Sequence, residues 1–379
     1  MRIAYDGVPL VGQRSGIGYY TEHLIRAVAR ADREARCVVV CPWPVKSLRA
    51  FPSLSFADPN IEIPQPAWWT RLYRRIRDGL GVPPPLEALI GPVDVFHGTN
   101  FLLNHPVRRA KRVVSIHDLT VMLFPQWHPA ERLREMHAGL RRSAEAADRI
   151  IAVSRYTKND IVKHLGVEPD RVAVVPLAVD PSLRPLPRDE IDAALAPLGL
   201  AHGTYLLFLG TIEPRKNVER LLDAVLAAGP DVGPLVLAGG LGWGNDALSP
   251  RIADLTRQGR VRALGYVPET LRAGLLGGAR ALVYPSLYEG FGLPPLEAMA
   301  CGTPVVTSNV SSLPEVVGDA ALLVNPLDVD ALAGAIKRLW HDESLRADLR
   351  ARGLARAQRF TWEHTARLTL DVYAAALRI

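Results

Sequence analysis

The chain has 379 residues, of which 48% are apolar and 22% charged, and its formal net charge is +6. This length exceeds what one hydrophobic core usually supports, so two domains are expected, and the composition is that of an ordinary soluble globular protein. No run of about 18 uncharged apolar residues occurs, which excludes a membrane-spanning helix.

Apolar runs that predict strands alternate with helical patterns through the first half of the chain. The runs are Arg2–Tyr5, Cys37–Cys41, Val93–Phe96, Arg112–Ile116, Arg149–Val153 and Val172–Val175. Because they are continuous in Val and Ile rather than alternating, they predict strands buried on both faces of a parallel sheet. Asp6 interrupts the apolar start, so the N-terminus is expected to be a strand rather than a signal peptide, and the protein cytoplasmic.

Glycines and histidines follow several of these strands. The segment Gly12–Tyr20 opens a helix that runs through Val28, and Gly16 and Gly18 let a substrate approach its backbone closely, although it is not a dinucleotide-binding G-x-G-x-x-G. His97 and His117 each end a strand, where an imidazole can bond a sugar hydroxyl or, as the more frequent case, a backbone carbonyl. Ser154 is expected to cap the helix that follows it.

The basic excess lies entirely in the first half. Residues 1–190 hold 27 Lys and Arg against 20 Asp and Glu, and the remainder holds 18 against 19. The basic residues gather in Arg71–Arg77, just after Trp68 and Trp69, in Arg108–Arg112 and in Arg132–Arg142. Such a face attracts an anionic membrane, a phosphorylated acceptor or nucleic acid. Nucleic acid is disfavoured because no aromatic residues interleave with the arginines; a merely solvated basic surface is the alternative reading.

The second half repeats the alternation after Leu183–Leu200, where Pro185, Pro187 and Pro197 predict a linker. The predicted strands are Tyr205–Leu209, Leu235–Ala238, Val261–Leu264, Ala281–Tyr284, Pro304–Thr307 and Ala321–Val324, and the predicted helices are Val218–Ala228, Leu248–Gln258, Pro268–Gly274, Leu296–Met299 and Asp330–Leu339. We expect an N-terminal acceptor-binding domain at residues 1–185 and a C-terminal donor-binding domain at 186–359. Two such α/β halves place a ligand cleft between the carboxyl ends of both sheets. The final segment 360–379, amphipathic over Trp362–Leu377, is expected to pack back on the first domain.

The segment Gly203–Asn217 predicts a strand, a turn and a helix start that carries Arg215 and Lys216. Cations at a helix N-terminus are opposed by the macrodipole. An anionic diphosphate held between them and the loop at Gly290 removes this conflict, which favours phosphate binding. Glu213 is either a ligand group or, as the safer interpretation, an ion-pair partner of Arg215.

The segment Tyr284–Gly302 places two carboxylates, Glu289 and Glu297, eight positions apart. Pro294 and Pro295 suit the first turn of a helix, so Glu289 is expected on the preceding loop and Glu297 within the helix. Exposed amides at a helix N-terminus bind anions, and the two acids could hold hydroxyl groups, which together indicate a nucleotide-sugar site. The macrodipole alone would also stabilise Glu297. Further along, Ser312 and Glu315 have the spacing of a capping box.

Taken together, these motifs resemble the retaining glycosyltransferases of family 4, whose GT-B fold has two Rossmann-like doubly wound parallel-sheet domains facing each other across a cleft. The resemblance covers essentially the full chain and is most specific at Glu289–Val306 and Gly210–Asn217. The segments Ser15–Gly18, Phe96–Asn100 and Ile116–Leu119 look like the mannosyltransferase branch. In that branch the usual donor is GDP-mannose and the products are bacterial surface polysaccharides such as lipopolysaccharide.

The resemblance implies a role for each matching residue. At the donor, Arg215 and Lys216 would bind the diphosphate, Glu297 the ribose hydroxyls and Glu289 the hydroxyls of the transferred sugar, and the amides of Phe291, Gly292 and Leu293 would contact sugar and phosphate. His117 would touch the donor sugar from the first domain, and the Gly16–Gly18 loop would border the acceptor. His117, Glu289, Arg215 and Lys216 are therefore the expected catalytic residues.

The implied reaction is metal-independent transfer of a hexose with retention at the anomeric carbon. No carboxylate is obviously placed as a nucleophile, so the resemblance favours attack on the same face as the leaving diphosphate. Cys37, Cys41 and Cys301 are too few and too scattered for a zinc site, and no cofactor is expected beyond the nucleotide-sugar substrate. The expected acceptor is a glycan or lipid-linked molecule, with peripheral membrane contact through the basic first domain.

Two other functions fit the same features. A nucleotide-sugar epimerase or a phosphorylase has the same architecture, although no residue is identified as the cofactor lysine of a phosphorylase. A catalytically inactive module that recruits partners through its basic face is the second alternative, which the presence of Glu289, Arg215, Lys216 and His117 disfavours.

Overall fold

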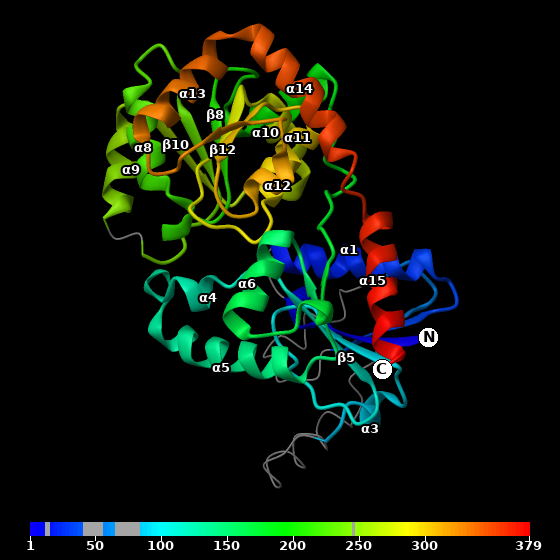
Figure 1. The fold of residues 1–379 in the computed structure, drawn as a ribbon. Coiled ribbons are helices and arrows are strands. Elements are labelled where there is room, and N and C mark those ends of the chain that lie inside the picture. The colour runs from blue at the N-terminus through cyan, green and yellow to red at the C-terminus, as the bar shows by residue number, and fades with distance from the viewer. Residues whose placement is uncertain (12–15, 41–55, 65–83, 245–246) are drawn as a thin grey trace. The chain divides into compact units, whose positions relative to one another are not determined.

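A computed structural model describes residues 1–11, 16–40, 56–64, 84–244 and 247–379. The chain divides into two compact units (Figure 1): the first contains Met1–Leu119, Arg134–Leu177 and Thr361–Ile379, and the second contains Thr120–Leu133 and Ala178–Phe360. Contacts thus place the boundary after Leu177 rather than after residue 185, and they assign residues 120–133 to the second unit. Gly12, Trp68, Trp69 and the arginines of Arg71–Arg77 lie outside the described residues.

The first unit is built on a seven-stranded sheet of order β3-β2-β1-β4-β5-β6-β7 in which all neighbours are parallel. Its strands are β1 (Arg2–Asp6), β2 (Arg36–Val40), β3 (Ile61–Glu62), β4 (Val95–Gly98), β5 (Lys111–Ile116), β6 (Arg149–Ala152) and β7 (Val172–Val174). The central strands are buried almost throughout, as their continuous apolar runs predict. The parallel sheet is confirmed, and only the two-residue β3 was not expected.

The helices of this part of the chain connect the strands. They are α1 (Gly16–Ala31), α3 (Glu87–Ile90), α5 (Ala130–Ala146), whose first four residues are assigned to the second unit, α6 (Arg155–Leu165) and α15 (Trp362–Leu377). Ser154 caps α6 as expected, since its hydroxyl accepts the amide N–H of Thr157 at 3.0 Å. The bounds of α15 are those given by the amphipathic pattern, and the helix packs against α1, β5 and β6.

The second unit is built on a six-stranded parallel sheet of order β10-β9-β8-β11-β12-β13. Its strands are β8 (Leu206–Leu209), β9 (Leu235–Ala238), β10 (Val261–Gly265), β11 (Ala281–Tyr284), β12 (Val305–Ser308) and β13 (Leu322–Val324). Its helices are α4 (Thr120–Leu123), α7 (Arg188–Leu195), α8 (Val218–Ala227), α9 (Leu248–Arg257), α10 (Glu269–Gly278), α11 (Leu293–Ala300), α12 (Leu313–Val317), α13 (Val329–His341) and α14 (Glu343–Ala357). Every strand expected in this half of the sequence is present, with ends that differ by one residue at most.

The expected linker at Leu183–Leu200 is wrong in part, because it contains the helix α7, which packs against α10. Pro187 precedes the helix and Pro197 lies in the short 3₁₀ turn after it, so the prolines flank α7 rather than interrupt it. The two helices approach closely because α10 presents glycine: a Cβ on Gly278 would stand 2.6 Å from Leu195 Cδ1.

Both sheets reverse their strand order once, between β1 and β4 and between β8 and β11. In an open parallel sheet, ligands bind outside the carboxyl ends of the strands at such a reversal. In the second unit the two segments that leave this point begin at Gly210 and at Pro285, and these segments carry the most specific motifs of the sequence. No helix among the described residues is long and apolar enough to span a membrane.

Candidate active site

The loop after β8 carries the two cations. Pro214–Lys216 forms one 3₁₀ turn, and Asn217 then adopts a left-handed conformation with φ 58° before α8 begins at Val218. Asparagine tolerates this conformation better than most residues. Its side-chain amide donates to the carbonyls of Pro285 at 3.1 Å and of Pro326 at 2.7 Å. Asn217 therefore ties the loop after β8 to the one after β11.

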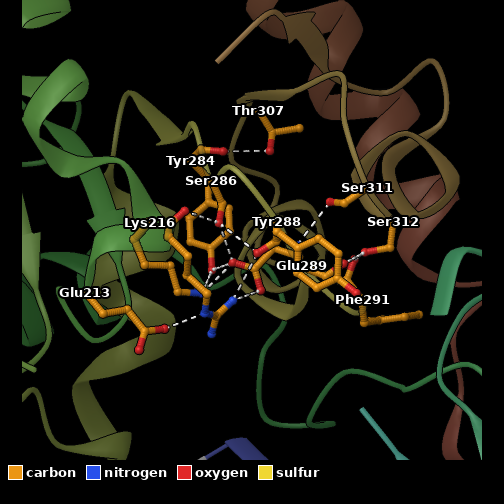
Figure 2. Close-up of polar contacts among 11 residues, drawn as sticks. Glu213, Lys216, Tyr284, Ser286, Tyr288, Glu289, Phe291, Thr307, Ser311 and Ser312 are labelled. Atoms are coloured by element: carbon orange, nitrogen blue, oxygen red, sulfur yellow. Dashed lines mark hydrogen bonds and ion pairs between the residues drawn. The ribbon is translucent and has the colours of Figure 1, made fainter. Parts of the chain in front are cut away.

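The carboxylate of Glu289 forms ion pairs with both cations, Arg215 and Lys216 (Figure 2). Lys216 Nζ lies 2.5 Å from Glu289 Oε1, and Arg215 Nη1 lies 2.6 Å from Glu289 Oε2. Arg215 Nε also lies 2.5 Å from Glu213 Oε1, so the ion pair chosen as the safer interpretation of Glu213 is present. The carboxylate of Glu289, rather than a ligand, occupies the position beside both cations and offsets their charge.

Two hydroxyl groups complete the surroundings of Glu289. Tyr284, at the end of β11, donates to Oε1 at 2.9 Å, and Ser286 donates to the same oxygen at 2.7 Å. Lys216 Nζ also donates to the Tyr284 hydroxyl. These roles could not be predicted from the sequence, because a tyrosine at the end of an apolar strand has the pattern of a core residue, and Tyr284 does stack on Phe208.

Charge fixes the protonation of this cluster. Burial raises the pKa of Glu289, but the neighbouring Arg215 and Lys216 outweigh burial and bring that pKa down to about 2. Burial together with Arg215 lowers the pKa of Lys216, while Glu289 and Glu213 act in the opposite direction. Glu289 is thus an ionised carboxylate with each oxygen already bonded, which does not suit a nucleophile.

Two serines from the loop before α12 hold the segment after Glu289. The Ser311 hydroxyl accepts the amide N–H of Glu289 at 3.1 Å, and the Ser312 hydroxyl donates to the carbonyls of Glu289 at 2.9 Å and of Phe291 at 2.7 Å. The capping box expected from Ser312 and Glu315 is therefore wrong: Ser312 makes no side-chain cap of α12. Its hydroxyl is used by the neighbouring loop instead.

The start of α11 offers backbone donors. Gly292 precedes the helix with φ 117°, and Pro294 and Pro295 lie in its first turn, as expected. No hydrogen bond recorded among the described residues uses the amide N–H of Phe291, Gly292 or Leu293. These amides lie at the positive end of the helix dipole, immediately after the ionised Glu289, and can bind an anion.

Glu297 lies within α11 and has a different environment. Its Oε1 accepts Arg272 Nη2 of α10 at 2.5 Å, and its Oε2 is buried without a hydrogen-bond partner among the described residues. Arg272 was not identified from the sequence, where it resembled any surface arginine of an amphipathic helix. Glu297 does not join the Arg215, Lys216 and Glu289 cluster through any recorded bond.

His117 and the glycines of α1 lie in the first unit. His117 is buried, and its Nε2 bonds the carbonyl of Thr99 at 2.8 Å. Its ring stands edge-on to Tyr20 of α1, with 4.8 Å between centroids. Burial lowers the pKa of His117, against smaller opposing effects of the Thr99 bond and of Asp118, so the imidazole is neutral. Gly16 and Gly18 lie in the first turn of α1, and residues 12–15 of that motif are outside the described part.

His97 forms the middle of a buried chain of polar groups. Its Nε2 lies 2.8 Å from the Ser115 hydroxyl, which lies 2.8 Å from that of Tyr20, and its Nδ1 lies 2.7 Å from the Tyr373 hydroxyl of α15. Burial lowers the pKa of His97 to about 3. His97 is therefore a buried, hydrogen-bonded structural histidine, which was one of the two interpretations of its sequence position. Within the described residues, no three His, Cys, Asp or Glu side chains are grouped as metal ligands.

Comparisons with known proteins match both halves of the chain. Residues 14–183 match the model of "Glycosyltransferase Family 4" and residues 198–356 that of "Glycosyl transferases group 1". The O-antigen chain mannosyltransferase B of Escherichia coli is 37% identical over 391 residues, which cover 98% of this chain and 99% of that protein. The MMP alpha-(1->4)-mannosyltransferase of Mycolicibacterium hassiacum is 29% identical over 423 residues, covering 100% and 98% of the two chains.

Solved structures agree on the architecture. Sucrose-phosphate synthase of Thermosynechococcus elongatus superposes with a TM-score of 0.75 at 24% identity, covering 99% of this chain and 98% of that one. HepE of Anabaena, in complex with UDP and glucose, superposes with a TM-score of 0.71 at 20% identity and 99% coverage of both chains. At these identities the likeness concerns the fold. With a relative 37% identical over nearly its full length, the chain belongs to glycosyltransferase family 4 and has the GT-B fold.

Proposed function

We propose that this glycosyltransferase transfers mannose from GDP-mannose, with retention of anomeric configuration, to a glycan or lipid-linked acceptor of a bacterial surface polysaccharide. The observation that carries the proposal is the cluster at the strand-order reversal: Arg215 and Lys216 are fixed by Glu289, beside the amides of residues 291–293. The choice of mannose is supported by relatives named as an O-antigen chain mannosyltransferase and an MMP alpha-(1->4)-mannosyltransferase.

The charges of the cluster bear on which groups would bind the donor diphosphate. Formally, the two cations are balanced by Glu213 and Glu289, so they add little net attraction for an anion. The donor diphosphate then relies also on the amides of Phe291, Gly292 and Leu293 and on the dipole of α11. We therefore expect the diphosphate at the start of α11 with Arg215 and Lys216 alongside it. Glu289 would lie next to the transferred sugar, where Oε2, whose one hydrogen-bond donor among the described residues is Arg215, can accept a hydroxyl hydrogen.

The same arrangement favours a reaction without a protein nucleophile. Glu289 is ionised, and both of its oxygens are occupied by Arg215, Lys216, Tyr284 and Ser286. The acceptor hydroxyl attacks on the face from which the diphosphate leaves, and a diphosphate oxygen takes its proton. The role of the protein is to stabilise the charge that develops on the leaving group and to hold the reactants in place.

The test measures donor binding and transfer. Among GDP-, UDP- and ADP-sugars, GDP-mannose should raise the melting temperature most, and incubation with acceptor should yield an α-linked product whose anomeric configuration is read by NMR. Lys216→Ala should lower turnover by about 10²–10³-fold, the effect of removing one transition-state donor. Lys337→Ala, an exposed lysine on α13, is the matched control and should be fully active.

Loss of fold must be separated from loss of chemistry, because removing one member of a buried ion pair costs about 3–5 kcal/mol. The double variant Lys216→Met with Glu289→Gln removes both charges together and should fold while remaining inactive. Near-normal turnover in that variant would refute the assignment. Conversion of GDP-mannose to an isomer without acceptor would indicate an epimerase instead.

We also propose that the protein acts at the inner face of the cytoplasmic membrane, through basic residues of α5. Arg134, Arg141 and Arg142 are exposed on this helix, and Arg134 and Arg141, seven positions apart, share one face. Each basic residue near an anionic bilayer contributes about 1 kcal/mol, screened by salt.

Vesicle sedimentation tests this contact. The protein should bind phosphatidylglycerol vesicles but not phosphatidylcholine vesicles, and binding should fall with salt. Changing Arg134, Arg141 and Arg142 to Glu should abolish it, whereas the same charge change at the exposed Arg257, Lys337 and Arg338 of the second unit should not. If both triple variants lose binding equally, net charge rather than α5 is responsible.

A further inference from the structure

The two glutamates of the Glu289–Glu297 pair are held in different ways. Glu289 is fixed by four side chains from two segments, namely Arg215 and Lys216 after β8 and Tyr284 and Ser286 at the end of β11. Glu297 has one recorded side-chain partner among the described residues, Arg272, and its second carboxylate oxygen is buried without any. A buried carboxylate with a single charged partner depends on that partner for its orientation.

We infer that Arg272 is the positioning residue of the nucleoside end of the donor site: its guanidinium holds the Glu297 carboxylate in place to accept hydroxyl hydrogens. This rests on the proposed function and on the role that the family resemblance implies for Glu297, which is to bind the ribose hydroxyls of the donor. Arg272 comes from α10, whereas Glu297 comes from α11, so the ion pair also fixes the distance between the two helices at this point. The inference concerns a residue that acts through Glu297 and not on the reacting atoms.

The geometry supports an orienting role over an ordinary surface ion pair. Arg272 Nη2 lies 2.5 Å from Glu297 Oε1, and the two side chains are 22% and 6% exposed. Exposed ion pairs of the same unit, such as Arg257 with Asp254, leave both partners more than half exposed and bind in competition with water. The pair sits one helical turn from the anion-binding start of α11, because Glu297 is the fifth residue of that helix.

The charge of Glu297 also affects a buried neighbour, Cys301. Burial raises the pKa of the Cys301 thiol to about 12, with a further increase from Glu297 and an opposite effect from Arg272. Without Arg272, the carboxylate would face this buried environment with no cation beside it. The carboxylate would then turn toward solvent, and this change removes an acceptor from the ribose.

The experiment compares GDP with inorganic pyrophosphate by calorimetry, since only GDP carries the ribose. Arg272→Met should weaken GDP binding by about ten- to a hundredfold, the effect of losing one hydrogen bond to a charged group, and leave pyrophosphate binding unchanged. In the transfer assay the KM for the donor should rise while kcat at saturating donor stays within about twofold of the original. Arg272→Lys keeps the charge and should restore part of the affinity.

A double-mutant cycle shows whether the effect passes through Glu297. Glu297→Gln alone should weaken GDP, and Arg272→Met added to it should cause no further loss. Arg251→Met is the control, because Arg251 pairs with Asp223 on a neighbouring helix of the same unit and leaves that carboxylate 42% exposed; it should bind GDP normally.

The outcomes separate this inference from the proposed function. If Glu297→Gln weakens GDP and Arg272→Met does not, Arg272 has no positioning role, while the donor site stands. If neither variant affects GDP, Glu297 does not bind the ribose and both ideas fail. Equal losses for GDP and pyrophosphate in Arg272→Met would mean a general distortion of the site and would also overturn the inference.

Discussion

The ionised Glu289 balances the charges of Arg215 and Lys216, and protonation of Glu289 in acid should break both ion pairs. A carboxyl group whose pKa is lowered on folding contributes stability above its ordinary value of 4.5, and this contribution is lost as the pH falls toward about 2. Only as the pH falls through about 2 does Glu289 take up a proton in the folded protein and leave Arg215 and Lys216 without their shared partner. The loop that precedes α11 is therefore expected to stay intact at neutral pH and to loosen only in strong acid.

Gly292 is the residue on which the shape of this loop depends. Its φ of 117° is a conformation that side chains rarely adopt, and a Cβ there would stand 2.8 Å from Leu313 Cδ2. We predict that Gly292→Ala lowers the free energy of unfolding by about 1–3 kcal/mol and weakens GDP binding, because the amides at 291–293 would be displaced. Thermal melts with and without GDP measure both effects.

Gly334 provides the matched control for that substitution. It lies on the exposed face of α13 with an ordinary φ, and a Cβ there meets no atom within 4 Å. Gly334→Ala should therefore raise stability by up to about 1 kcal/mol through helix propensity and leave GDP binding unchanged. Equal behaviour of the two alanine variants would show that the conformation of Gly292 is not required.

At the scale of elements, the sequence predicted strands better than connections. Buried parallel strands are runs of Val, Ile and Leu with no competing pattern, so their ends were placed closely. The helix α7 was taken for a linker because its flanking prolines read as breaks, and α14 was not expected because its arginines obscure a narrow apolar stripe. Packing against neighbouring helices, which no local pattern contains, stabilises both.

The residues of the candidate site likewise include some that could be predicted from the sequence and some that could not. Arg215 and Lys216 were recognisable because cations at a helix start are unusual without an anionic partner, and Glu289 because it lies in a glycine-containing loop at a strand end. Glu297 was recognised by its spacing from Glu289 and by the family resemblance, since the macrodipole alone would also stabilise an acid there. The hydroxyls of Tyr284 and Ser312 and the guanidinium of Arg272 were not recognisable, because their roles depend on contacts between segments distant in sequence. Ser312 even satisfied a local capping pattern that the fold does not use.

At the scale of the whole molecule, the chain builds the first unit, then the second, and returns to the first with α15. The return is fixed by polar groups as well as by packing. Tyr373 of α15 meets the His97 imidazole of β4 at 2.7 Å and donates to the Tyr5 hydroxyl of β1 at 3.2 Å. Because α15 completes the first unit, that unit depends on contacts between residues as far apart in sequence as Tyr5 and Tyr373.

Two compact units of this kind should unfold in two transitions, and each should respond to its own perturbation. GDP should raise only the transition of the second unit, because a ligand stabilises the unit that binds it. Tyr373→Phe should lower only the free energy of unfolding of the first unit, by about 1–3 kcal/mol, since the buried His97 and Tyr5 lose their hydrogen-bond partner. Tyr266→Phe is the control, because that ring is 56% exposed, and it should shift neither transition.

Calorimetric scans of the full chain with and without GDP measure these shifts. A single transition that moves as a whole with GDP and with Tyr373→Phe would mean that the two units unfold as one, and α15 would then stabilise the entire chain rather than the first unit.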